Sequence, residues 1–212
     1  MNEHVADSIP TRSQRLKAAT HTVHDALDKR IMDADIFASR GKFSGFLRVQ
    51  YRFHRDVDTL YANPQLAELI PALAQRRRLL LVANDLGDLG GPLPAAVAGR
   101  LDMHATLPAA LGWLYVAEGS NLGGAVLFKL ARDRLGLAHN FGARHLAAHP
   151  DGAARHWRQF TTALDTVALT QAQEDEAVQA AEEAFRTVRR YVEEELPLDG
   201  GALPMTRSSL RA

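Results

Sequence analysis

Residues 112–125 read GWLYVAEGSNLGGA, a helical pattern that contains four glycines. Each glycine inside a helix costs about 1 kcal/mol relative to alanine, so the four cost on the order of 4 kcal/mol. Gly112, Gly119 and Gly123 project within about 40° of one another and would leave a groove without side chains along one helix face. Such a groove suits either tight packing against another helix or the close approach of a flat ligand.

Ser120 and Asn121 lie between these glycines. Small polar residues next to glycine allow a helix to bend, and a bend frees a backbone carbonyl to bind water or a bound oxygen species. We therefore expect a kinked helix in this region.

The rest of the chain is also helical in pattern, with glycine and proline gathered at a few points. We predict one all-α domain, residues 11–197, between a flexible N-terminus (1–10) and a flexible C-terminal tail (198–212). Helices are expected over residues 11–32, 39–61, 64–88 and 106–136, with a short helix after residue 92. A long ordered loop over 138–152 precedes two further helices, and the last of these runs from residue 170 to 196.

Composition excludes several functional classes. The 212 residues include 25 Lys and Arg against 25 Asp and Glu, so no basic field favours nucleic acid or an anionic membrane. No apolar run approaches the roughly 20 residues that span a bilayer, and residues 1–10 lack the order of a signal peptide. The absence of cysteine excludes disulfides, iron–sulfur clusters and a cysteine nucleophile. We expect a cytoplasmic monomer that acts on a small molecule.

The first predicted helix carries one histidine at the rim of an apolar stripe. We expect this stripe to be buried, and it consists of Leu16, Ala19, Val23, Leu27 and Ile31. Lys17 projects within about 20° of His24 and lies about 10 Å away along the axis. The helix could thus place an imidazole on a metal and an ammonium at the anionic edge of the same ligand, as haem would require. A solvated histidine is the common alternative, and His21 is the weaker ligand candidate.

Two polar residues share the apolar face of the second predicted helix. Gln50 and His54 lie on the stripe formed by Phe43, Phe46, Leu47, Val57, Leu60 and Tyr61. Buried polar side chains need hydrogen-bond partners, so we expect a polar network that is either structural or organises water beside a cofactor. The triplet 76–78 (RRR) could add a cation, although a basic triplet is usually solvated.

These residues resemble the haem oxygenases of Gram-negative bacteria, of the iron-acquisition and phytochrome-associated types. The resemblance extends from about Ser13 to Glu195. It rests on separated matches in order, namely residues 13–16 (SQRL), His24, 37–40 (FASR), 50–51 (QY), 112–123, 127–129 (LFK) and 140–146 (NFGARHL). It implies a single-domain helical bundle with haem between a proximal helix and a kinked distal helix.

The resemblance assigns roles position by position. His24 matches the proximal iron ligand. The residues expected to contact the haem, at its propionates or from the distal helix, are Lys17, Tyr115, Asn121 and Gly124. The residues expected to shape the oxygen side and to order water there are Gly119, Ser120, Gly123, Gln50, His54 and Arg78.

One position departs from part of the family. Relatives that open haem away from its alpha carbon carry a lysine that would fall at Leu130 in this chain. Lys129 is its neighbour, but it points about 100° away. The resemblance therefore implies opening at the alpha meso carbon.

The reaction implied by the resemblance uses haem as both cofactor and substrate. With O2 and external electrons it gives biliverdin, carbon monoxide and ferrous iron. Histidine ligation, unlike thiolate ligation, does not promote cleavage of the O–O bond. The sequence has no glycine-rich nucleotide fingerprint, so a separate ferredoxin or flavin reductase would supply the electrons.

The sequence argues against two other helical functions and leaves a third open. A di-iron bundle would need Glu-x-x-His pairs, and a thiamin-degrading enzyme of related fold would need a cysteine nucleophile; the sequence contains neither. A non-catalytic haem store or carrier would keep His24 and stays open as the alternative. The glycines and the distal polar residues favour turnover.

Overall fold

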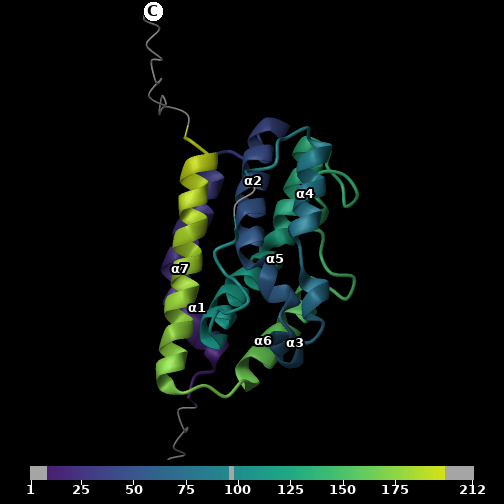
Figure 1. Cartoon of the computed structure of the whole chain (residues 1–212). Coiled ribbons are helices and arrows are strands. Elements are labelled where there is room, and N and C mark those ends of the chain that lie inside the picture. Colours follow the sequence, from purple (N-terminus) through teal and green to yellow (C-terminus); the bar gives the residue numbers. More distant parts are fainter. Residues whose placement is uncertain (1–8, 96–97, 199–212) are drawn as a thin grey trace, which may run out of the picture.

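The computed structural model describes residues 9–95 and 98–198, and its regular structure is helical (Figure 1). The α-helices are α1 Arg12–Asp33, α2 Arg40–Val57, α3 Pro64–Leu69, α4 Leu79–Asp88, α5 Leu107–Leu135, α6 Ala153–Thr166 and α7 Gln171–Glu195, with short 3-10 helices η1 Asp58–Ala62, η2 Leu73–Arg76 and η3 Arg144–Leu146. Extended pairing among the described residues is limited to isolated bridges at Ala138. The all-α prediction is confirmed. The expected flexible segments lie almost wholly outside the described residues, so the domain limits stay predictions.

Helix α5 runs through the middle of the molecule, and α7 packs along both α5 and α1 (Figure 1). The Thr106 side chain caps α5 by accepting a hydrogen bond from the Ala109 N–H, and Gly136 ends the helix with a φ of 66°. Residues 110–118 of α5 are buried, whereas most residues from 120 to 130 are exposed or half-buried. One half of α5 therefore builds the core and the other half lies at the surface.

Gly112 allows α5 and α7 to approach closely. A Cβ at this position would lie 2.9 Å from the Cβ of Ala180 and 2.9 Å from the backbone nitrogen of Ala181. Gly123, in contrast, has open space around its Cβ position, with no atom within 4 Å. The groove predicted for the three glycines is thus divided: tight helix packing accounts for Gly112, while Gly123 is open.

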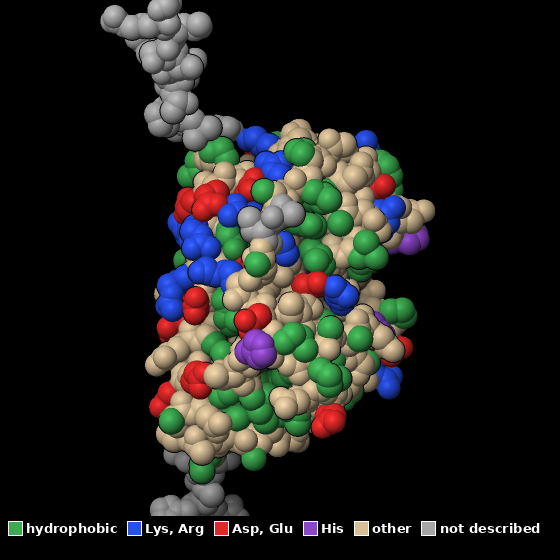
Figure 2. All heavy atoms as spheres, in the orientation of Figure 1, with side chains coloured by type: hydrophobic (Ala, Val, Ile, Leu, Met, Phe, Trp, Pro, Cys, Tyr) green, Lys and Arg blue, Asp and Glu red, His purple; other side chains and the backbone are tan. Residues whose placement is uncertain are grey.

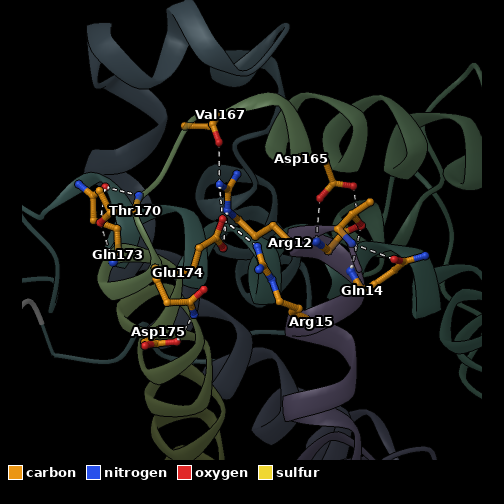
Figure 3. A network of polar contacts seen from close by, with 12 residues as sticks. Arg12, Gln14, Arg15, Asp165, Val167, Thr170, Gln173, Glu174 and Asp175 are labelled. Carbon is orange, nitrogen blue, oxygen red and sulfur yellow. Dashed lines mark hydrogen bonds and ion pairs between the residues drawn. The ribbon is translucent and has the colours of Figure 1, made fainter. Parts of the chain in front are cut away.

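The N-terminal end of α1 is fixed to the junction of α6 and α7 (Figure 3). The side chain of Arg12 is 4% exposed and forms an ion pair of 2.7 Å with Glu174. Ser13 donates its backbone N–H and its hydroxyl to the Asp165 carboxylate, over 2.7 and 2.8 Å. This buried, charge-assisted network sets the position at which α1 begins.

The C-terminal end of α1 is fixed as well. Arg30 donates to the Leu196 carbonyl over 2.6 Å and lies 3.3 Å from the Glu193 carboxylate. The first residues of α1 therefore contact the start of α7, and its last residues contact the end. Helices α1 and α7 run parallel and are joined at both ends.

The outer face of α7 is charged and solvated. Basic and acidic side chains alternate over this helix at the left of Figure 2, and pairs four residues apart include Arg186 with Glu182 and Arg190 with Glu194. Such exposed pairs contribute about 0.3–0.5 kcal/mol each. Helix α7 is instead held by its inner apolar face, where the small residues Ala177, Ala181 and Ala184 are fully buried.

Two predictions about helices are wrong. The third helix does not run from 64 to 88, because Ile70 is extended before Pro71 and Ala72 is left-handed with a φ of 54°. Helix α4 starts anew at Leu79. The short helix expected after residue 92 does not form in the described residues between 92 and 106. Within 9–95 and 98–198, no helix combines the length and apolarity needed to cross a membrane.

Candidate functional site

His24 lies in the middle of α1 with an accessible imidazole, since its side chain is 53% exposed. Its Nδ1 atom is 3.4 Å from the Asp25 carboxylate and 3.6 Å from that of Asp28, and its ring packs edge-on against Phe185 of α7. A carboxylate at Nδ1 favours the proton on that nitrogen and leaves the Nε2 lone pair free for a metal. Burial raises the pKa of Asp28, while the neighbouring His24 opposes that rise.

The face of α1 beside His24 is apolar and open. Leu16, Leu27 and Ile31 are buried as predicted, but Ala19 and Val23 are exposed, Val23 by 39%. The prediction is wrong for these two residues because helical periodicity shows which residues share a face but not what covers it. An uncovered apolar strip beside an accessible imidazole is a surface that a flat apolar ligand could cover.

Lys17 and His21 are also exposed on α1. Lys17 has no hydrogen bond or ion pair with any residue that the structure describes, so its ammonium group is available to an anionic ligand. His21 lies 3.5 Å from Asp25, four residues along the helix. The described part of the chain contains no group of three or more His, Asp or Glu side chains that could hold a metal ion.

The surface half of α5 carries the predicted distal residues. Its helical structure continues through the glycines, so the kink stays a prediction. Ser120 donates to the Ala117 carbonyl over 2.7 Å, and the amide nitrogen of Asn121 is buried with no partner in the described part of the chain. Gly124 passes close to η3, because a Cβ there would lie 3.3 Å from the Leu146 carbonyl oxygen. Leu122 and Val126 are exposed by 42% and 66%, which continues the open apolar surface onto α5.

Tyr115 and Gly119 are brought together by Trp157 of α6. The Tyr115 and Trp157 rings lie 5.5 Å apart between centroids, and a Cβ at Gly119 would lie 3.6 Å from the Trp157 ring. Burial raises the pKa of Tyr115, and the charge of Asp165 adds to the rise. Tyr115 is therefore a neutral hydroxyl at pH 7, able to donate a hydrogen bond to a carboxylate.

A buried ion pair that the sequence analysis missed supports α5 just before Gly119. Arg76 donates to Glu118 over 2.8 Å with both side chains 1% exposed, and the Tyr61 hydroxyl donates to the other carboxylate oxygen over 2.9 Å. Burial raises the pKa of Glu118, although the Arg76 charge and hydrogen bond oppose this. The sequence signal for this pair was Glu118 itself, the single acid in the apolar run 113–118. The triplet 76–78 is thus not simply solvated.

A second polar cluster is built around His145 and Arg78, and the buried His54 lies close enough for both to act on its pKa. Arg78 donates to the His145 backbone carbonyl, and His145 Nδ1 lies 2.8 Å from Asp85. His145 Nε2 and His54 Nδ1 are both buried without a partner among the residues that the structure describes. Burial lowers the pKa of His54 to about 3, and His145 and Arg78 contribute to this shift, so His54 is neutral at pH 7.

Gln50 stands apart from this network. It is half-buried on α2, and no hydrogen bond joins its side chain to the described residues. The shared hydrogen-bond network expected for Gln50 and His54 therefore stays a prediction: His54 is buried, but no hydrogen bond joins its side chain to the described residues either. The polar atoms that these residues leave unpaired could be satisfied by ordered water.

These observations fit a haem group between α1 and the surface half of α5. Helix α1 offers an accessible imidazole and a free ammonium, and α1 and α5 both expose apolar side chains. The donor set suits iron with an axial histidine and a macrocycle with carboxylates. His54, Asn121 and His145 also carry buried polar atoms without a partner among the described residues.

Comparison with known proteins identifies the family. The family model described as "Heme oxygenase" matches residues 11–194. The chain is 43% identical over 174 residues to the heme oxygenase PigA of Pseudomonas aeruginosa, which covers 82% of this chain and 87% of that protein. It is 37% identical over 166 residues to a heme oxygenase of Xanthomonas campestris, covering 76% of this chain and 90% of the relative.

Solved structures show the same relationship. The NO- and CO-bound heme oxygenase of Neisseria meningitidis matches with a TM-score of 0.82 and 41% identity, over 92% of this chain and 96% of that one. Heme oxygenase-1 of Synechocystis, solved in complex with heme, matches over 87% of this chain and 92% of that one; its TM-score is 0.69 at 17% identity, which supports the fold alone. Through the family match and these identities, the chain belongs to the haem oxygenase family.

Proposed function

We propose that the chain binds haem between α1 and α5 with His24 on the iron, and opens the macrocycle to biliverdin, carbon monoxide and ferrous iron. The observation that carries this proposal is the accessible His24 imidazole beside exposed apolar side chains. O2 is the oxidant, and a separate ferredoxin or flavin reductase supplies the electrons. The chain acts as a cytoplasmic monomer and binds no nucleic acid.

The residues of the proximal side bind and orient the haem. Asp25 and Asp28 lie within 3.6 Å of His24 Nδ1 and would fix the tautomer that presents Nε2. Lys17 has an unpaired ammonium, and Tyr115 keeps its proton because burial raises its pKa. These two groups would hold the haem propionates, one by charge and the other by a hydrogen bond.

The residues of the distal side leave space for the haem face and place polar groups beside it. Gly123 has open space at its Cβ position, and Gly119 contacts only the Trp157 ring there. The absence of side chains at these positions lets the helix backbone approach the haem face closely. Asn121 contributes an unpaired amide, while Ser120 and Gly124 keep this stretch small.

Protons reach the site through ordered water held by polar side chains. His54 is neutral at pH 7 because burial lowers its pKa to about 3, so it binds water as a neutral imidazole rather than as an acid. Arg78 keeps a buried positive charge near it, and Gln50 adds an amide at the half-buried edge. Bound haem supplies the iron that activates O2 and the carbon skeleton that is opened.

We propose opening at the alpha meso carbon. Leu130 is half-buried on α5 where an alternative seating would need a lysine, and Lys129 beside it is exposed. Chromatography of the bilin isomers tests this, and an isomer other than alpha would show that Lys17 and Tyr115 do not control the seating.

A spectroscopic experiment tests the function. Purified protein with added haem should give a histidine-ligated Soret spectrum, and a reductant with O2 should convert it to a bilin that absorbs in the red. The variant His24→Ala should abolish turnover, whereas the matched control His21→Ala, one helical turn away on the same exposed helix, should retain it. An unchanged Soret band under reductant and O2 would leave a haem store or carrier instead. Loss of turnover in the His21 variant alone would refute the ligand assignment.

A further inference from the structure

An open cavity of about 820 Å³ lies against α6. Its walls are the segment from Leu69 to Arg76 and the face of α6 that carries Arg155, Arg158 and Thr162. Trp157, which contacts Tyr115, lies on the same helix. We call this space the α6 cavity; neither His24 nor any of the predicted distal residues lines it.

The α6 cavity has an excess of positive charge. Arg155 and Arg158 both line it, and neither forms an ion pair with a described residue. Arg76 also lines it, but its charge is balanced by Glu118. Among the described lining residues Asp151 is the one acid. Two guanidinium groups on one helix, three residues apart, therefore line a space that contains a single acid, with which neither forms an ion pair.

Two stacked histidines extend this surface with N–H donors. The His149 and His156 rings lie 4.4 Å apart between centroids at an angle of 3°. Arg76 Nη1, which can only donate, lies 3.3 Å from His156 Nδ1, and the Asp151 N–H donates to His149 Nδ1 over 3.2 Å. Both Nδ1 atoms therefore accept, and both protons reside on Nε2, where no described residue accepts them.

The neutral form of His156 follows from its surroundings. Burial is the largest factor that lowers its pKa, to about 4, and the charge of Arg76 adds to the effect. At pH 7 the cavity thus combines two free guanidinium groups with imidazole N–H donors. This chemistry recognises anionic oxygen atoms.

We propose that the α6 cavity binds an organic anion through two carboxylates, one at Arg155 and one at Arg158. A guanidinium group matches the planar, bidentate geometry of a carboxylate, and two such groups select two carboxylates on one molecule. A volume of about 820 Å³ exceeds the needs of an inorganic anion and lies within the range of small-molecule sites, about 300–1,000 Å³.

Two sources could supply such a ligand. The first is the linear tetrapyrrole with two propionates that the reaction forms, and this identification rests on the proposed function. The second is a free small dicarboxylate. The shared chemistry is the pair of carboxylates, and the experiment below separates the two sources.

Calorimetric titration of the full-length chain tests the proposal. Haem-loaded protein without reductant is titrated with biliverdin, and protein with and without haem is titrated with succinate. The test variant is the double substitution Arg155→Gln and Arg158→Gln. Both side chains are exposed, so folding should be unaffected, as circular dichroism would verify. The matched control is Arg134→Gln, an exposed arginine near the end of α5 without an ion pair to a described residue.

We expect saturable biliverdin binding that weakens at least tenfold in the double variant and changes less than twofold in the Arg134 variant. Binding should also weaken as salt is added. Succinate binding with the same variant dependence, in the absence of biliverdin binding, would identify the free dicarboxylate as the ligand and support the proposal.

No binding of either probe at millimolar concentration would overturn the proposal, as would binding that the double variant leaves unchanged. The readout requires no turnover. A chain that fails to bind haem would refute the proposed function, while the succinate titration would still decide whether the α6 cavity binds dicarboxylates.

Discussion

The buried pair Arg76–Glu118 predicts a large loss of stability on a nearly isosteric change. In Glu118→Gln, the side-chain oxygen can still accept from Tyr61, but the Arg76 guanidinium loses its counter-charge in a site where both side chains are 1% exposed. Removing one partner of a buried ion pair costs about 3–5 kcal/mol. Arg76 still donates to the backbone carbonyls of Pro71 and His156. Because these hydrogen bonds partly stabilise the guanidinium, we expect a loss near the lower end of that range, about 3 kcal/mol.

Thermal and urea unfolding, followed by circular dichroism, would measure this loss. For a chain of this size, about 3 kcal/mol corresponds to a fall in Tm of about 6–12 °C. The control is Glu182→Gln, which removes the same charge from an exposed pair with Arg186 at 3.4 Å and should cost less than about 0.5 kcal/mol. Equal losses in the two variants would refute the reasoning, as would a loss below about 1 kcal/mol for Glu118→Gln.

Three further predictions concern single positions. His54 has a pKa of about 3 in the folded chain against 6.5 for a free side chain. Its contribution to the free energy of unfolding is therefore fully present above pH 6.5. This contribution is lost as the pH falls toward 3, at up to about 1.4 kcal/mol per pH unit. In urea unfolding between pH 7 and 5, the free energy of unfolding of His54→Gln should therefore fall less steeply with pH than that of the unchanged chain. Gly112→Ala should destabilise the chain by about 1–3 kcal/mol, because its Cβ would press on the Ala180 side chain and on α7 backbone; a neutral effect in urea unfolding would contradict this. Gly123→Ala meets no atom and should stabilise the haem-free chain by up to about 1 kcal/mol while weakening haem binding in a Soret titration; unchanged haem affinity would argue against a close approach at this position.

Much of the fold follows from local signals in the sequence. Thr106 before Pro108 and Thr170 before Gln173 predict the starts of α5 and α7, because side-chain capping depends only on neighbouring residues. The break at Pro71 was also signalled locally, since a residue that precedes proline disfavours the helical conformation. The apolar face of α2 was predicted correctly because it is covered along its whole length, with Phe43 and Leu47 fully buried.

The remainder depends on contacts between distant segments. Periodicity places Gly112 and Gly123 on one face, but only the position of α7 decides that the first is packed and the second open. In the same way, the triplet 76–78 does not reveal which arginine is buried, because the partner of Arg76 is Glu118, 42 residues further along the chain. The site residues on α1 and α5 were identified by their spacing together with the resemblance. Their roles toward haem stay proposals.

Because α1 is attached to α7 at both ends, the number of residues between the two attachment points determines where His24 lies. Between Arg12 and Arg30, α1 rises about 27 Å, and between their partners Glu174 and Glu193, α7 rises about 28 Å. The two spans match, and His24 lies inside the span, where its ring packs against Phe185 of α7. Deleting one residue of α7 between the anchors would shorten that span by about 1.5 Å and turn the remainder by about 100°. The His24 imidazole would then be displaced without any change on its own helix, so the length of α7 between the two anchors determines where this imidazole lies.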